Sequence, residues 1–156
     1  MPAPALRLMC SLALTSALLA ACSSLDDQQP ARSIAAMPGL GVSTFKVTAR
    51  DEQARAWFAQ GLLLTYAFEH EEAARVFRAA LARDPSCAMC AWGVAYALGP
   101  NYNKPWEFFD AVDFASTVQR THSAVENGAR IAGTHATAVE RQNAALAARF
   151  RQIFSQ

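Results

Sequence analysis

The sequence predicts an all-α fold of about five helices, arranged as antiparallel hairpins that stack into a short solenoid. Three observations predict it. From Phe45 onward apolar residues recur at helical spacing, and no alternating strand pattern is longer than Thr44–Val47. Alanine, the residue with the highest helix propensity, is abundant. Glycine, proline and capping residues divide the region into segments of helix length.

The first two expected helices are separated by a short break. The first begins near Thr48 or Asp51, with the carboxylate of Asp51 suited to the positive end of the helix dipole, and extends to about Phe68. The break lies at Glu69–His70. The second helix ends before Asp84, and the residues that we expect on its buried face are Ala73, Phe77, Ala80 and Leu81.

Three further helices are expected beyond this point. Asp84 suits the N-cap and Pro85 the first turn of a third helix, which extends to about Leu98. Glycine and proline then predict a loop over Gly99–Pro105. The last two helices are expected over Trp106–Asn127, with Gly128 as the stop, and over Thr134–Phe154.

The N-terminus has the pattern of a lipoprotein signal peptide, over residues 1–21. Arg7 precedes an apolar run, Leu8–Ala21, that is shorter than the roughly 20 residues needed to span a bilayer. Its end, Leu-Ala-Ala before Cys22, resembles the bacterial lipobox, in which this cysteine is lipidated. The resemblance implies a lipid anchor at Cys22 in the bacterial envelope, at the outer membrane and facing the periplasm. The alternative is an ordinary cleavage site beside a chance cysteine.

The mature chain divides into a tether and one domain. Residues 22–44 mix polar residues with Pro and Gly without a period and are expected to be flexible, whereas residues 45–156 are expected to form the helical domain. The chain has 14 Lys and Arg against 13 Asp and Glu and no basic stripe, so nucleic acid is not an expected partner. No phosphate-binding loop, zinc helix or nucleophile elbow occurs, and nothing indicates an enzyme or a cofactor.

One segment matches the consensus of the tetratricopeptide repeat. The consensus Leu and Tyr are replaced by Gln60 and Leu64, and the residues that match at the consensus offsets are Trp57, Gly61, Ala73, Phe77, Ala80 and Pro85. This predicts a clear repeat over about 54–87, a degenerate repeat over about 88–127 and a partial third hairpin over 134–154. Gly61 and Ala73 would let the helices touch, and Trp57 and Phe77 would fill the gap between them.

A longer stretch, Phe58 to Pro105, resembles a narrower family of bacterial tetratricopeptide-repeat lipoproteins and secreted proteins. The shared signature has the form FxHxEA followed by DPxCAMxxWGxAxxxGPNxN. It is carried here by Phe68, His70, Glu72 and Ala73, and then by Asp84, Pro85, Cys87, Ala88, Met89, Trp92, Gly93, Ala95, Gly99, Pro100, Asn101 and Asn103. The resemblance implies a fold and a compartment rather than an activity, and this chain would be a short or truncated member.

Two candidate sites remain. Cys87 and Cys90 lie one helical turn apart, which favours packed residues or a simple disulfide, with a redox-active pair or a metal site as alternatives. His70 begins the second helix, which antiparallel packing brings beside the end of the third. A histidine at such a turn is more often a cap or a satisfied structural group. The alternative, and the second candidate site, is a polar pocket for a small ligand or a metal, lined by His70, Asn101, Tyr102 and Asn103.

The expected function is protein interaction with an unidentified protein or peptide partner. The inner helices of stacked hairpins line a concave groove that accepts an extended peptide or a partner helix. The groove residues expected here are Gln53, Gln60, Thr65 and Tyr96. The alternatives are a small-ligand or metal-binding protein, possibly catalytic, at the His70 pocket and a thiol-redox protein that uses Cys87 and Cys90.

Overall fold

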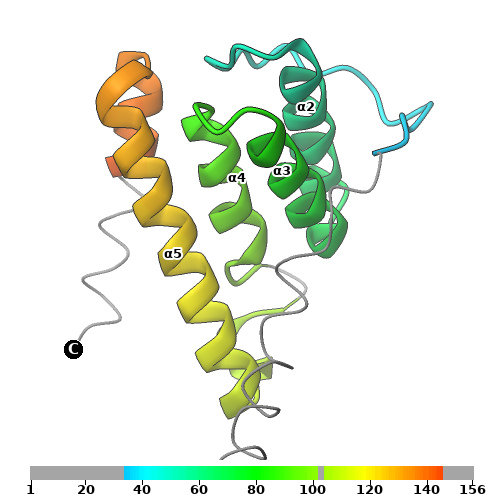
Figure 1. The fold of residues 1–156 in the computed structure, drawn as a ribbon. Coiled ribbons are helices and arrows are strands. Elements are labelled where there is room, and N and C mark those ends of the chain that lie inside the picture. Colours follow the sequence, from blue (N-terminus) through cyan, green and yellow to red (C-terminus); the bar gives the residue numbers. More distant parts are fainter. Residues whose placement is uncertain (1–33, 102–103, 146–156) are drawn as a thin grey trace, which may run out of the picture. The chain divides into compact units, whose positions relative to one another are not determined.

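The computed structural model describes residues 34–101 and 104–145, all within the larger of two compact units, Ser33–Gln156. In these residues the fold is all-α, as predicted, and contains no strand. Residues 138–145 are also helical. The helices are α2 (Glu52–Tyr66), α3 (His70–Arg83), α4 (Ala88–Leu98), the short 3-10 helix η1 (Trp106–Phe108) and α5 (Ala111–His135) (Figure 1).

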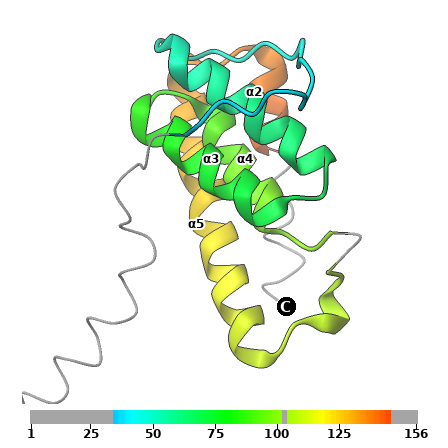
Figure 2. The same ribbon diagram turned by 90° about the vertical axis from the view of Figure 1, so that its right-hand side faces the viewer.

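Each helix of this part packs against the next one in the chain. Contacts join α2 to α3, α3 to α4 and α4 to α5, and α2 also touches α4 (Figure 2). The chain reverses between α2 and α3 within the three residues 67–69. This order of neighbours is that of stacked helical hairpins.

The core is built around the fully buried ring of Phe77 in α3. The ring of Phe58 in α2 lies 5.4 Å from it, centroid to centroid. Gly61 of α2 and Gly93 of α4 face the same ring edge: a Cβ atom would come within 2.9 Å of it at Gly61 and 2.5 Å at Gly93. Since neither glycine has a side chain, three helices can meet around one phenyl ring.

The other residues of the repeat pattern are placed in two ways. Ala73 and Ala80 are fully buried in α3, and Trp57 is half-buried against the core. Pro85 is exposed in the turn after α3. Five of the six pattern residues therefore pack between helices, while Pro85 does not start the next helix as expected.

The third helix begins at Ala88 rather than at Pro85. Its N-cap is Cys87, whose Sγ accepts a hydrogen bond from the N–H of Cys90. Asp84 follows the last residue of α3, and its carboxylate accepts hydrogen bonds from the backbone of Arg50 and Asp51 instead of capping α4. A tertiary contact has taken the side chain that local sequence assigned to the helix start.

The fourth helix also differs from the prediction. The α-helix begins at Ala111, capped by Asp110, and continues through Gly128 to His135. Gly128 is buried, and a Cβ atom there would lie 3.4 Å from the carbonyl oxygen of Ala88. This glycine allows a close approach of α5 to α4 and does not end the helix. The helical segment that follows starts at residue 138 rather than at Thr134.

An extended segment, residues 34–49, lies against the helices. Ile34 is buried in the core cluster, and Gln60 of α2 donates a hydrogen bond of 3.0 Å to the carbonyl oxygen of Ala35. The rings of Phe45 and Phe58 are 6.0 Å apart. Ile34, Leu40, Val47 and Ala49 of this segment thus contact the helices, and Ile34 and Leu40 lie within the stretch that the sequence predicts to be a flexible tether.

Candidate functional site

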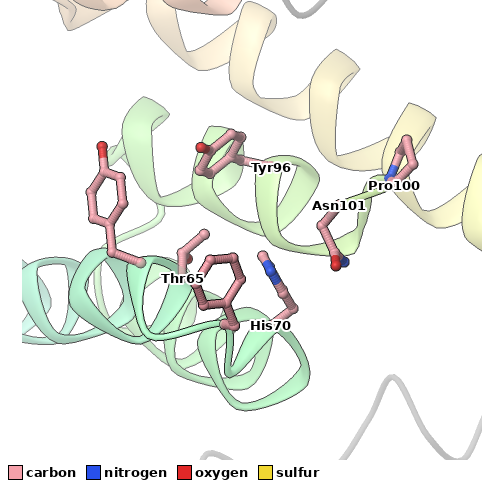
Figure 3. A pocket seen from close by; sticks show the side chains of 7 residues that line it. Thr65, His70, Tyr96, Pro100 and Asn101 are labelled. Atoms are coloured by element: carbon pink, nitrogen blue, oxygen red, sulfur yellow. The ribbon is translucent and has the colours of Figure 1, made fainter. Parts of the chain in front are cut away.

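A pocket of about 230 Å³ lies where the turn between α2 and α3 faces the end of α4 (Figure 3). The antiparallel arrangement expected from the sequence brings His70 and Asn101 together in it. Tyr102 and Asn103, the other two predicted pocket residues, lie outside the described residues. The lining residues are Thr65, Tyr66, Phe68, His70, Tyr96, Pro100 and Asn101.

His70 is the polar group of this pocket whose hydrogen bonds are missing. Both of its ring nitrogens are buried, and neither has a hydrogen-bond partner in the described part of the chain. Burial lowers the pKa of His70 below its ordinary 6.5. The imidazole is therefore neutral at about pH 7, with one N–H donor and one lone-pair acceptor. Because unmet hydrogen bonds of a buried group cost free energy, a ligand that supplied partners would be stabilised here.

Three aromatic side chains around His70 are exposed to solvent. Tyr66 is 68% exposed, Phe68 56% and Tyr96 47%. The ring of Phe68 meets that of His70 edge-on at 6.3 Å, and Tyr96 stacks on Trp92 at 4.8 Å. Aromatic residues that gather on a surface and are rimmed by polar groups mark interaction sites.

Phe68 also has an unfavourable backbone conformation. Among the described residues it is the one non-glycine residue with a positive φ, 65°. The left-handed region costs a residue with a side chain about 1–2 kcal/mol. Local strain of this kind concentrates at binding sites. Here it places an aromatic ring in the pocket at a turn position where glycine or asparagine would be free of strain.

The residues on either side of His70 in the chain, which we call the rim of the pocket although they do not line the cavity, carry negative charge. Glu69 and Glu71 flank His70 and are exposed, and neither forms an ion pair in the described residues. Glu72 is neutralised by Arg75, whose Nε donates to it at 2.7 Å. Lys104, the cation beyond Asn101, pairs with Asp113. Two uncompensated carboxylates therefore adjoin the pocket.

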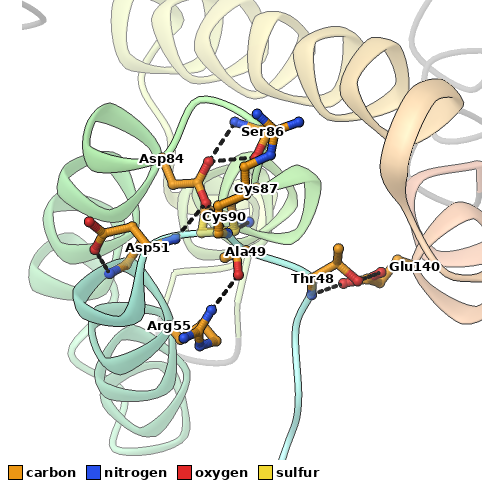
Figure 4. Close-up of a disulfide and its surroundings, with 11 residues drawn as sticks. Thr48, Ala49, Asp51, Arg55, Asp84, Ser86, Cys87, Cys90 and Glu140 are labelled. Atoms are coloured by element: carbon orange, nitrogen blue, oxygen red, sulfur yellow. Dashed lines mark hydrogen bonds between the residues drawn. A yellow bond between two sulfur atoms is a disulfide. The ribbon is translucent and has the colours of Figure 1, made fainter.

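The two cysteines lie at the other end of α4 and form a disulfide (Figure 4). Both residues are 0% exposed, so an external thiol cannot reach the sulfur atoms in the folded protein. The described residues contain no cluster of three or more His, Cys, Asp or Glu side chains that could hold a metal ion. The disulfide closes the first turn of α4, and this position indicates a structural role.

The same end of the domain contains a buried carboxylate that holds the extended segment. Asp84 accepts hydrogen bonds from the backbone N–H of Arg50, of Asp51 at 3.1 Å and of Ser86 at 2.9 Å, and from the Ser86 hydroxyl at 2.6 Å. Burial raises the pKa of Asp84, but these hydrogen bonds outweigh it and lower the pKa to about 2. The carboxylate is ionised, and its acceptor sites are used within the fold.

Glu140 plays the same part on the other side of the segment. Its buried carboxylate accepts from the N–H of Thr48 at 2.6 Å and from the Thr48 hydroxyl at 2.7 Å (Figure 4). It also accepts from the N–H of Thr137 at 2.7 Å. Burial raises the pKa of Glu140, and the hydrogen bonds from Thr48 and Thr137 lower it by more. Asp84 accepts four hydrogen bonds and Glu140 three, and both carboxylates tie distant segments together.

The four expected groove residues do not form one surface. Gln53 is exposed, Gln60 is half-buried and donates to the carbonyl oxygen of Ala35, and Thr65 is buried with its hydroxyl donating to the carbonyl of Gly61. Thr65 and Tyr96 share the pocket instead. The sequence does not mark Tyr66 and Phe68 as site residues, and the signal that it carries for them is a pair of aromatic residues directly before the predicted helix break.

No protein-family model matches this chain, and neither the curated proteins nor the solved structures include one that is significantly similar to it. The helices of the described residues include none that has both the length and the apolar character to cross a membrane. The expected lipidation site, Cys22, and the signal peptide lie outside the described residues.

Proposed function

We propose that this protein is an interaction module of the bacterial envelope, anchored by a lipid at Cys22 at the outer membrane, and that it binds a partner protein through the pocket at His70. The observation that carries the proposal is the set of solvent-exposed aromatic rings, Tyr66, Phe68 and Tyr96, around an imidazole with unmet hydrogen bonds. Residues of this kind supply most of the binding free energy at protein interfaces when a partner desolvates them.

The dimensions of the pocket support a protein partner over a free metabolite. Sites for drug-sized ligands enclose about 300–1,000 Å³. The cavity here is about 230 Å³, and its aromatic walls remain largely open to solvent. One side chain of a partner fills such a hollow, and the exposed rings around it then form the rest of the interface.

Site-specific photo-crosslinking in the living bacterium tests the proposal. A photoreactive phenylalanine analogue replaces Tyr66 at the pocket, and in the matched control it replaces Phe108, which is 72% exposed and does not line the pocket. We expect a discrete protein adduct from position 66 and not from position 108, and its yield should fall when Tyr96→Ser is added. Equal adducts from both positions, or none at position 66, would contradict the proposal.

The lipid anchor has a separate test. The variant Cys22→Ser removes the expected acceptor of the lipid. It should move the protein from the membrane fraction to the soluble periplasmic fraction, while Ser23→Ala should leave it in the membrane fraction. If the Cys22→Ser protein still sediments with the membrane, the anchor is not a lipid on this residue.

A second candidate is a small-ligand protein that uses the same pocket, and the unmatched nitrogens of His70 favour it. Native mass spectrometry of the protein purified from the envelope separates the two. A bound metabolite or metal at one equivalent, together with no protein adduct, would favour the second candidate. A thiol-redox role is not proposed, because the disulfide is fully buried.

A further inference from the structure

We propose that the His70 pocket anchors a tyrosine or tryptophan side chain of the partner and that this residue adjoins a lysine or arginine. The inference rests on the proposed function and names what the pocket selects. Three properties of the described residues carry it: the size and aromatic lining of the cavity, the neutral imidazole within it, and the negative rim.

The lining favours an aromatic side chain. Phe68 and Tyr96 both line the hollow and each expose about half of their surface. Phe68 comes from the α2–α3 turn and Tyr96 from α4. Aromatic pairs gain more than their buried area when the rings pack offset or edge-on. A flat ring between two such walls makes these contacts, whereas an aliphatic side chain makes only the burial.

The imidazole favours a ring that carries a polar hydrogen. His70 is neutral and offers one acceptor and one donor. A tyrosine hydroxyl can satisfy either one, and an indole N–H can satisfy the acceptor. The ring nitrogens are already closed to water in the free protein, so a phenylalanine or leucine side chain would leave them without a partner and would gain only the burial. Its binding would lack this hydrogen bond and be weaker by about tenfold.

The rim favours a basic neighbour. Glu69 and Glu71 are exposed beside the pocket, and the nearby cations Arg75 and Lys104 are already paired with Glu72 and Asp113. A lysine or arginine next to the anchor residue meets these carboxylates, and a glutamate there is repelled. Because such exposed pairs are screened by salt, the preference should shrink as ionic strength rises.

Short blocked peptides provide the probes: Lys-Trp-Lys, Lys-Tyr-Lys, Lys-Leu-Lys and Glu-Trp-Glu, with methyl glucoside as a carbohydrate that also stacks on aromatic rings. Binding to the ¹⁵N-labelled protein purified from the envelope is followed by NMR titration. At low salt we expect Lys-Trp-Lys to bind at least about tenfold more tightly than Lys-Leu-Lys and than Glu-Trp-Glu, with shifts at His70 and Tyr96. High salt should erase the advantage over Glu-Trp-Glu alone.

Variants assign each preference to its residues. Tyr96→Ser should weaken all tryptophan peptides, and the double variant Glu69→Gln/Glu71→Gln should remove the preference for basic neighbours but keep that for tryptophan. His70→Phe should reduce the advantage of tryptophan over leucine to the part that the aromatic walls Phe68 and Tyr96 provide. Phe108→Ser, an exposed aromatic residue outside the pocket, is the control and should change nothing.

Three results would each overturn the inference. They are equal binding of the tryptophan and leucine peptides, binding of methyl glucoside but of no peptide, and no binding at millimolar concentration. These failures differ from a failure of the proposed function. A pocket-dependent protein adduct without the peptide preferences leaves the proposed function standing, whereas absence of that adduct contradicts the function whatever the peptides do.

Discussion

Replacing Gly93 by alanine places a methyl group against the most buried ring of the core. The new Cβ atom would lie 2.5 Å from Cδ1 and 2.6 Å from Cε1 of Phe77. Normal contact between carbon atoms is about 3.5–4.0 Å, so the ring would have to move by about 1 Å. Phe77 is fully buried, and Gly61 lies against the same edge of the ring, which leaves little room for that movement.

The control for this substitution is Gly133→Ala. Gly133 also lies inside a helix, and a Cβ atom there would have no heavy atom within 4 Å. Both substitutions gain about 1 kcal/mol from helix propensity. That gain cancels in the comparison, so the difference between the two variants isolates the overpacking at Phe77. Overpacked cores typically lose about 1–3 kcal/mol, and the very short contacts place this site near the upper value.

Urea unfolding followed by far-ultraviolet circular dichroism, with the disulfide intact, measures both variants. We expect Gly133→Ala to be slightly more stable than the wild type and Gly93→Ala to be less stable than Gly133→Ala by about 3 kcal/mol. Adding Phe77→Leu to Gly93→Ala should give a loss smaller than the sum of the two single losses, because the shorter side chain frees space. Equal stability of the two alanine variants, or strict additivity with Phe77→Leu, would refute the packing argument.

Three further predictions concern a carboxylate, the disulfide and the strained turn. The pKa of Asp84 is about 2 in the fold against an ordinary 3.8, so its contribution of about 2 kcal/mol to stability is complete above pH 3.8 and is lost as the pH falls toward 2. In urea titrations Asp84→Asn should be less stable than the wild type at neutral pH, and its stability should depend less on pH in the acid range. An unchanged acid dependence would contradict this prediction. In urea titrations the double variant Cys87→Ala/Cys90→Ala should have a free energy of unfolding about 2 kcal/mol lower than the oxidised protein, as the very short disulfide loop implies. A larger loss together with an altered helix content would show that the disulfide does more than close the first turn of α4. Phe68→Gly should be about 1 kcal/mol more stable than Phe68→Ala, because glycine adopts a positive φ without strain. Both variants should bind the Lys-Trp-Lys probe more weakly than the wild type. Equal stabilities of the two variants would mean that the turn is not strained.

Local signals in the sequence predicted the helices well where no distant residue competes for the capping group. Asp51 is the N-cap of α2, and its side chain accepts from the N–H of Ala54, three residues ahead. Asp84 and Pro85 present an equally good local cap, yet α4 starts later. The carboxylate of Asp84 is held by the N–H groups of Arg50 and Asp51, and this competition is invisible to any local pattern.

Two glycines show the same difference between a role that local spacing predicts and a role that tertiary packing sets. The repeat spacing marked Gly61 as a close-packing position, and this glycine does meet Phe77. Gly128 was expected to end a helix, since glycine often does so. In the fold it is buried where α5 passes the start of α4, and the helix continues. Whether a glycine stops a helix or admits a neighbour depends on what packs there, which is a property of the tertiary structure.

The candidate site was half predictable. Antiparallel packing of consecutive helices is enough to bring His70 to Asn101, because it depends only on helix order and length. The exposure of Tyr66, Phe68 and Tyr96 was not predictable, since an aromatic residue at helical spacing usually lies in the core. Their exposure depends on where α4 ends relative to the α2–α3 turn.

Periodicity and turn residues act over a few positions, so the helical class and the order of α2, α3 and α4 follow from local patterns in the chain. Antiparallel packing of these helices also puts His70 of α3 beside the end of α4, away from the two cysteines. Contacts between distant segments bring Asp84 and Glu140 to the extended segment and Gly93 and Gly61 to Phe77. Such contacts also leave three aromatic rings in water around an unsatisfied imidazole. Hydrogen-bond partners and burial arise between segments far apart in the chain, and no local pattern carries that information.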